Sequence, residues 1–265
     1  MEPDDAPRWT DCHNHVQLLP VADWDVVLAA MSQAGVVRCV VNATREEEWR
    51  AVEELAVAWP ERVVPAFGIH PWYAADVAAG WEDRLRSLLE RHPRAGVGEC
   101  GLDGLAAVEQ AAQRRVFEAQ LGIAGELGRV LTIHCVGGWN GLFEALTKEP
   151  PPPRFLMHGY SGSVETALRL ARMGAWFSCN GSLLEPRRRK AVETFRKLPP
   201  ERIVLETDAP TGLPPAEWVN HPLPGQANHP ANLPRIGMGL AAALGREVAE
   251  LAERMERNAA ELLGC

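Results

Sequence analysis

The sequence has no excess of basic residues and no long apolar run. Its 27 Lys and Arg residues stand against 35 Asp and Glu residues, for a formal net charge of −8. This argues against non-specific binding along a nucleic-acid backbone, which needs a basic face, but not against an enzyme that meets one phosphate locally. No stretch of about 18 apolar residues indicates a membrane span. The N-terminal segment MEPDDAPRW shows no secretory signal.

The sequence also lacks a Cys-x-x-Cys motif among its six cysteines. Those expected inside strands as buried apolar thiols are Cys12, Cys39, Cys100, Cys135 and Cys179. Reduced thiols are typical of the cytosol. We therefore expect a cytoplasmic protein without membrane contact, and no segment indicates an obligate protein partner. The chain also lacks G-x-S-x-G, P-loop and Rossmann glycine patterns, so serine hydrolase, kinase and dehydrogenase functions have no support.

Strand-like and helix-like segments alternate along the chain. Runs typical of strands cover 36–43, 62–70, 95–102, 129–136, 154–160, 174–181 and 202–209, and a weaker first strand near 8–13 makes eight. The length of 265 residues is close to the roughly 250 of a (β/α)8 barrel, and eight alternating units favour a closed parallel barrel. No linker-like run interrupts the pattern. We predict an α/β protein, a (β/α)8 TIM barrel, with residues 1–265 as a single domain.

Imidazoles and carboxylates occur where these predicted strands end. They are His13, His15, His70, Glu99, His134, His158 and Asp208. The carboxyl ends of barrel strands meet at one rim, where such barrels build their active sites. Imidazole nitrogens and carboxylate oxygens bind divalent metals of borderline hardness. A single rim histidine is as often only a hydrogen-bonding residue, but the whole set in this order indicates a metal-dependent hydrolase.

The motifs around these residues resemble those of the TatD family of metal-dependent hydrolases, within the amidohydrolase-like barrel superfamily. DCHNH is similar to the opening D-x-H-x-H of the family. GIHP, GVGECGLD, IHC, MHGYSGS and LETDAP resemble its later signatures in order. NHPANLP at 228–234 and ERNAAELLG at 256–264 resemble its end. The resemblance covers almost the whole chain.

The resemblance implies a centre with two divalent metal ions. The ligands would be His13, His15 and Asp208 for one ion, His134 and His158 for the other, and Glu99 as a bridge between them. Nitrogen-rich ligation favours zinc in affinity, with manganese, nickel, iron or magnesium as alternatives. Many members of the superfamily use a carbamylated lysine on strand four as the bridge. The only lysines here are Lys148, Lys190 and Lys197, none near that strand end.

The activity implied is hydrolysis of phosphodiester bonds, as a deoxyribonuclease, through a metal-activated water. DNA or a small phosphate-containing molecule would be the substrate. Asp208 would accept the proton of the water, and His70 would contact the substrate or a phosphate oxygen. Together with Glu99 they are the predicted catalytic residues. Two alternatives are a hydrolase of amide, lactone or small phosphate-ester substrates and, with less support, a non-catalytic metal-binding barrel.

Three positions depart from the family pattern. Val136 stands where an arginine is usual two residues after the strand-five histidine. Gly104 replaces an aromatic residue after GLD, and Gly159-Tyr160 replaces a phenylalanine. The missing arginine favours the alternative hydrolase, while the metal prediction is unaffected. Arg45 and Arg187 are other sources of positive charge.

Further residues are expected in loops at the catalytic face. Trp72, Trp139 and Trp218 lie there, where stacking on a base or ring competes with ordinary packing. Asp103 is expected to orient a metal ligand. The long loop 210–234 is expected to shape substrate access.

Overall fold

The computed structural model describes residues 7–264, so the predictions for residues 1–6 lie outside the described residues. The chain divides into two compact units. The first unit comprises Met1–Val40, Gly159–Arg172 and Trp176–Cys265. The second unit comprises Val41–His158 and Met173–Ala175.

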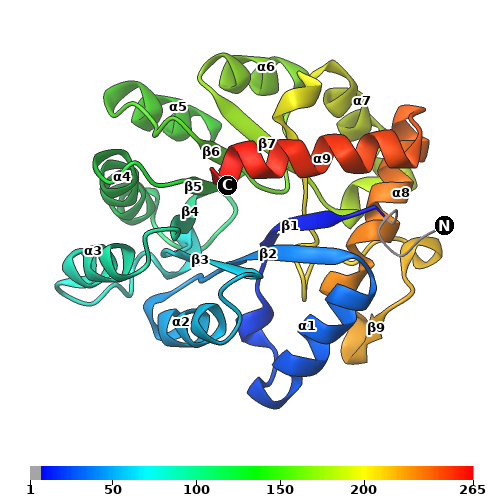
Figure 1. The fold of residues 1–265 in the computed structure, drawn as a ribbon. Coiled ribbons are helices and arrows are strands. Elements are labelled where there is room, and N and C mark those ends of the chain that lie inside the picture. The colour runs from blue at the N-terminus through cyan, green and yellow to red at the C-terminus, as the bar shows by residue number, and fades with distance from the viewer. Residues whose placement is uncertain (1–6, 265) are drawn as a thin grey trace. The chain divides into compact units, whose positions relative to one another are not determined.

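Eight strands alternate with helices in the predicted order (Figure 1). They are β1 (Trp9–Asn14), β2 (Val36–Asn42), β3 (Val63–Phe67), β4 (Gly96–Asp103), β5 (Leu131–Val136), β6 (Phe155–Met157), β7 (Ala175–Cys179) and β8 (Ile203–Leu205). The sheet order is the sequence order, β1 to β8. The pairs β3–β4, β4–β5, β5–β6 and β7–β8 are parallel. Within the first unit β1 also contacts β8, so the two ends of the strand order meet. This is the predicted (β/α)8 barrel.

Helices lie between successive strands and after the last one. They are α1 (Trp24–Gln33), α2 (Trp49–Ala58), α3 (Trp81–Arg91), α4 (Gln110–Glu126), α5 (Trp139–Lys148), α6 (Val164–Arg172), α7 (Arg189–Lys197), α8 (Leu233–Leu244) and α9 (Val248–Leu263). Each buries an apolar stripe; in α3, for example, Trp81, Leu85, Leu88 and Leu89 are buried. Among the described residues, no helix combines the length and apolarity needed to cross a membrane.

Two buried glutamines of α4 fix the backbone next to the predicted site in the second unit. The Gln113 side chain accepts a hydrogen bond from Asp103 N (2.8 Å) and donates one to Asp103 O (3.0 Å). Gln120 does the same for Ile69 N (2.8 Å) and Ile69 O (3.1 Å). Buried backbone groups that leave the sheet must find such partners. The amides therefore hold the end of β4 and the residue before His70 in fixed positions.

In the first unit, the long loop after β8 is fixed by asparagines of the NHPANLP motif. It includes the short antiparallel pair β9 (Pro222–Leu223) and β10 (Ala227–Asn228). Asn228 Nδ2 donates to Thr207 O at 2.9 Å and to Gly212 O at 3.4 Å. Asn232 Oδ1 accepts from Asn220 N and His221 N at 3.1 and 2.9 Å. The loop is thus tied to the residue that precedes Asp208.

Candidate metal centre

The first unit brings together three of the predicted ligands. His13 lies on β1, His15 directly follows that strand, and Asp208 follows β8. The Nε2 atoms of the two histidines are 3.1 Å apart. Asp208 Oδ1 lies 3.7 Å from His13 Nε2 and 3.5 Å from His15 Nε2. Both histidines are buried, whereas the Asp208 side chain is 19% exposed. Three donor atoms therefore face one another, with one open side at Asp208.

Backbone hydrogen bonds hold these residues in place. Asp208 N donates to His13 O at 3.0 Å, and His15 N donates to Ala209 O at 2.7 Å. Asp208 adopts a left-handed conformation with φ +54°, which is uncommon outside glycine but easier for Asp and Asn than for other residues. This conformation turns the chain after β8, and the bonds to the end of β1 stabilise it.

Asp11, which the sequence analysis left without a role, clamps the same region. Its Oδ1 accepts from Thr207 N (2.9 Å), and its Oδ2 accepts from Thr207 Oγ1 (2.5 Å) and Asn14 Nδ2 (3.1 Å). His13 N donates to Asp11 Oδ1 at 3.3 Å. Complete burial raises the pKa of Asp11 to about 7, although the hydrogen bonds from Thr207 and Asn14 oppose the shift. The first Asp of the D-x-H-x-H motif thus positions the histidines and the turn that carries Asp208.

We expect Asp11→Ala to lower the free energy of unfolding by about 2–4 kcal/mol, since several buried donors lose their acceptor at about 1–3 kcal/mol each. Metal affinity should fall about 10–100-fold, the usual effect of losing an orienting partner. Asp11→Asn keeps one acceptor oxygen and should recover part of both losses. Urea unfolding of the metal-free protein and metal titration measure the two effects separately. Unchanged metal affinity in a folded Asp11→Ala protein would contradict the positioning role.

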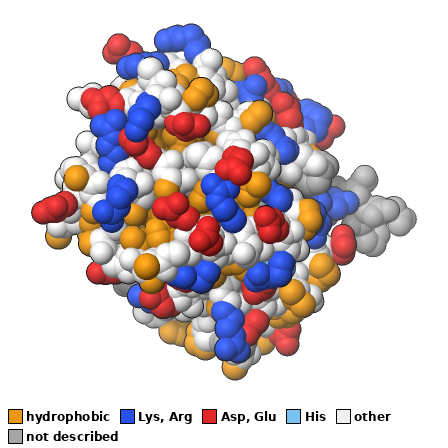
Figure 2. All heavy atoms as spheres, turned by 90° about the vertical axis from the view of Figure 1, so that its left-hand side faces the viewer, with side chains coloured by type: hydrophobic (Ala, Val, Ile, Leu, Met, Phe, Trp, Pro, Cys, Tyr) orange, Lys and Arg blue, Asp and Glu red, His pale blue; other side chains and the backbone are white. Residues whose placement is uncertain are grey.

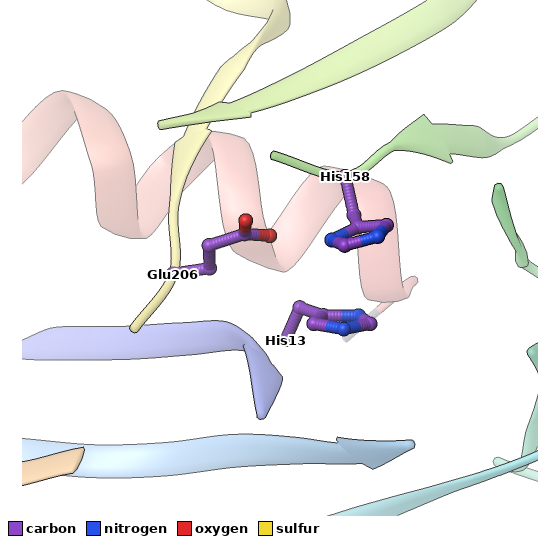
Figure 3. A group of neighbouring side chains, drawn as sticks. All are labelled: His13, His158 and Glu206. Atoms are coloured by element: carbon purple, nitrogen blue, oxygen red, sulfur yellow. The ribbon is translucent and has the colours of Figure 1, made fainter. Parts of the chain in front are cut away.

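Glu206 is a second carboxylate that the sequence analysis overlooked. It directly follows β8, is fully buried, and has a ligand atom within 4.8 Å of one on His13. Figure 3 shows its side chain together with His13, from β1, and His158. Its carboxylate accepts from Ser178 Oγ at 2.5 Å and from Asn180 Nδ2 at 3.2 Å. The signal was present in the LETDAP motif, but only the fold shows that the first acidic residue of the motif faces inward.

In the second unit, one carboxylate oxygen of Glu99 faces three imidazoles. Glu99 Oε1 lies 2.7 Å from His158 Nε2, 3.1 Å from His134 Nδ1 and 3.3 Å from His70 Nε2. His134 Nδ1 and His158 Nε2 are themselves 3.2 Å apart. Glu99 and His70 are buried. Glu99 is thus the centre of this cluster, and His70 lies nearly as close to it as the two predicted ligands do.

An irregularity in β4 determines where Glu99 points. The pairing of β4 with β5 shifts register between Val97 and Cys100, and such bulges re-aim side chains beside active sites. Gly101, with φ +140°, faces His134, and a Cβ there would lie 1.9 Å from His134 O. The glycine is therefore needed for the close approach of the strands that carry Glu99 and His134.

His134 and His70 have further partners that fix their orientation. Asp103 Oδ2 lies 3.5 Å from His134 Nε2, in the position expected of an orienting carboxylate. Trp72 N donates to His70 Nδ1 at 3.3 Å, which leaves the proton of a neutral His70 on the nitrogen that faces Glu99. Burial lowers the pKa of His70, although the Glu99 carboxylate opposes the shift.

The donor types of both clusters suit a divalent ion, and the spacing in the first unit matches a tetrahedral one. Nitrogen and oxygen ligands about 2.0–2.2 Å from a tetrahedral ion lie about 3.3–3.6 Å from one another. The separations in the first unit, 3.1, 3.5 and 3.7 Å, bracket this range. Those between Glu99, His134 and His158 are 2.7, 3.1 and 3.2 Å, so these side chains would have to move slightly apart to hold a tetrahedral ion. Mixed imidazole and carboxylate donors suit zinc and the neighbouring transition metals.

Neither alternative arginine is placed as a free cation at the clusters. Arg45 is half-exposed, lies 3.2 Å from the Glu48 carboxylate and covers the Tyr73 ring at 5.1 Å. Arg187 is an exposed residue of the 3-10 helix before α7, 4.0 Å from Glu185. Val136, at the end of β5, leaves no charge at the position of the usual arginine.

The fold and these clusters define the chain as a metal-dependent hydrolase of the barrel type. A sequence model of the family described as TatD related DNase matches residues 10–264, and the chain belongs to this family. The protein is similar to the "3'-5' ssDNA/RNA exonuclease TatD" of Pantoea ananatis, at 32% identity over 249 residues, which covers 92% of this chain and 94% of the relative.

Two further comparisons concern one Escherichia coli protein. The "Uncharacterized metal-dependent hydrolase YjjV" of strain K12 is 29% identical over 256 residues, 95% of this chain and 96% of that protein. The crystal structure of this TatD homologue superposes with a TM-score of 0.88 at 27% identity, over 97% of this chain and 98% of that one. The likeness supports the barrel fold over the full described length.

Proposed function

We propose that the protein is a nuclease, a TatD-type hydrolase that cleaves phosphodiester bonds of single-stranded DNA. The observation that carries the proposal is the convergence of three imidazoles on one oxygen of the buried Glu99 carboxylate. The name of the Pantoea relative, a 3'-5' single-stranded DNA and RNA exonuclease, supports the substrate class. On the face drawn in Figure 2, acidic and basic side chains are interspersed, which suits recognition of a strand at the site rather than along a basic surface.

We further propose that residues 1–265 work as one barrel with a two-metal centre. One ion would be held by His13, His15 and Asp208, the other by His134 and His158, with Glu99 as the bridge. Zinc is the favoured metal, and manganese, nickel, iron and magnesium are alternatives. When bound, the ions would supply an activated water and positive charge for the phosphate. The buried thiols of the five described cysteines support a cytoplasmic location.

The side chains themselves would move and orient protons. Asp208 accepts a hydrogen bond from Thr211 Oγ1 on Oδ2 at 2.8 Å, and its exposed side lets the carboxylate accept a proton from the attacking water. His70, whose Nε2 faces Glu99 at 3.3 Å, would contact the substrate or a phosphate oxygen beside that carboxylate. Glu99 would fix the positions of the His134 and His158 side chains.

The test uses purified protein with a 5'-labelled single-stranded DNA oligonucleotide and, in parallel, chromogenic esters, lactones and amides. We expect shortening of the oligonucleotide that requires divalent metal and stops with EDTA, together with bound transition metal by elemental analysis. A protein that binds no metal after reconstitution, or that leaves the oligonucleotide intact, would contradict the proposal. Hydrolysis of acyl substrates alone would favour the second candidate, which the absent arginine at Val136 supports.

A further inference from the structure

Two large apolar side chains remain exposed beside the second-unit cluster. Trp72 is 55% exposed and Leu105 is 83% exposed. Trp72 lies in the 3-10 helix Pro71–Tyr73, which begins directly after His70. Leu105 lies two residues after the end of β4. Folding normally buries an indole, so a tryptophan held open at a site is typical of a contact surface for a ligand.

One carboxylate holds both residues in place. Trp72 Nε1 donates to Asp103 Oδ2 at 2.7 Å, and Leu105 N donates to Asp103 Oδ1 at 2.8 Å. Burial of Asp103 acts to raise the pKa of its carboxyl group. The hydrogen bonds from Trp72 and Leu105, together with the nearby His134, outweigh burial, so the pKa is lowered. The indole is therefore anchored at its N–H group while more than half of its surface stays open.

The anchor connects these side chains to the candidate ligands. Asp103 Oδ2 lies 3.5 Å from His134 Nε2. The Trp72 ring also meets the His70 ring edge to face, with centroids 4.8 Å apart and planes at 81°. A molecule lying on the indole would thus lie beside His70, and the Asp103 carboxylate would link the indole to His134.

A groove lies beside the turn between Asp103 and Leu105. It has a volume of about 470 Å³ and is lined by Gly104, Gly137, Gly138, Trp139 and Asn140, among others. Gly104 stands between Asp103 and Leu105, where the family pattern has an aromatic residue. A Cβ at Gly104 would lie 3.0 Å from Gly137 C, and one at Gly138 would lie 2.8 Å from Leu102 Cβ, so side chains larger than glycine would not fit where these turns pack.

We propose that Trp72 and Leu105 form a stacking platform for one nucleobase of the substrate strand, the base next to the scissile phosphate, and that the glycine-lined groove accepts the adjoining sugar. This inference rests on the proposed nuclease function. Every base offers a π face to an indole, so the platform would bind without strong sequence preference.

The experiment compares two single-stranded oligonucleotides, one complete and one with an abasic residue next to the scissile phosphate. The wild-type protein should cleave the complete strand with a kcat/KM about 5- to 150-fold higher, the range of base–aromatic stacking. Trp72→Ala should lose this preference, with its main effect on KM for the complete strand. Trp72→Phe also loses the bond to Asp103 but keeps a ring, and it should restore most of the preference. Val57→Ala, at a 68% exposed position of α2, should match the wild type.

The outcomes separate this inference from the function on which it rests. Cleavage of both strands at equal rates by the wild type would overturn the platform and leave the nuclease intact. Cleavage of neither strand would remove the proposed function and the platform together. If Trp72→Ala is slower on both strands but keeps the preference, Trp72 only supports Asp103 and the inference is wrong. Should Trp72→Ala fail to fold, Leu105→Ala, at an exposed position, carries the same comparison and should reduce the preference.

Discussion

Replacing Glu99 with glutamine is expected to reduce hydrolysis by more than about 100-fold. The substitution keeps the shape of the side chain but removes the negative charge that faces His70, His134 and His158. An amide group turned towards these imidazoles would also present N–H where they require an acceptor. Loss of an outer partner of a metal site costs about 10–100-fold, so loss of the central carboxylate should exceed about 100-fold.

Activity and metal content of Glu99→Gln should be measured on one preparation, with the thermal unfolding midpoint as a test of folding. We expect bound metal to fall as well, because the second-unit cluster would then offer imidazole nitrogens but no central carboxylate oxygen. Glu118→Gln is the matched control, since this α4 carboxylate pairs with Arg114 and Lys148 at the surface and such pairs contribute little. Full activity with undiminished metal in Glu99→Gln would show that Glu99 is not the bridge.

The sequence was sufficient to predict the barrel and the residues of both clusters because each signal was local. Alternating strand and helix patterns marked the eight strands; His134 lies two residues before the end of β5, and His158 directly follows β6. His70 lies three residues after β3, and Asp208 lies three residues after β8. Both are close enough to a strand end to be assigned to the catalytic rim from sequence. The exact strand ends differ by a few residues, since strand assignment depends on pairing that composition alone does not show.

The residues that position these ligands could not be predicted in the same way. Asp11 binds Thr207, a partner 196 positions away in the chain, and Glu206 is held by Ser178 and Asn180. No periodicity links such positions, so their contacts follow only from the folded backbone. The role of Gln113 and Gln120 was hidden for a related reason, because an amide within a helix is ordinarily a solvent-facing residue.

Asp208→Asn is expected to damage chemistry far more than it damages the fold. Asn accepts left-handed backbone as readily as Asp, so the φ of +54° should persist. The bonds from Asp208 N to His13 O and from His15 N to Ala209 O should persist as well. The amide oxygen still faces His13 and His15, and it remains a weak ligand. It cannot accept a proton near neutral pH, so turnover should fall by about 10²–10⁴, the usual contribution of general-base catalysis.

The decisive measurement for Asp208 is turnover per bound metal, because two roles are combined in one side chain. With His13 and His15 in place, 3.1 Å apart, the variant should retain part of its metal while losing nearly all turnover. Raising the metal concentration until occupancy matches the wild type should not restore the rate. Asp25→Asn, at an exposed position of α1, controls for the loss of one carboxylate and should behave as wild type. If turnover recovers fully when metal occupancy is restored, Asp208 acts only as a ligand. Another group must then accept the proton of the attacking water. The buried Glu206, near His13, is the first group to test.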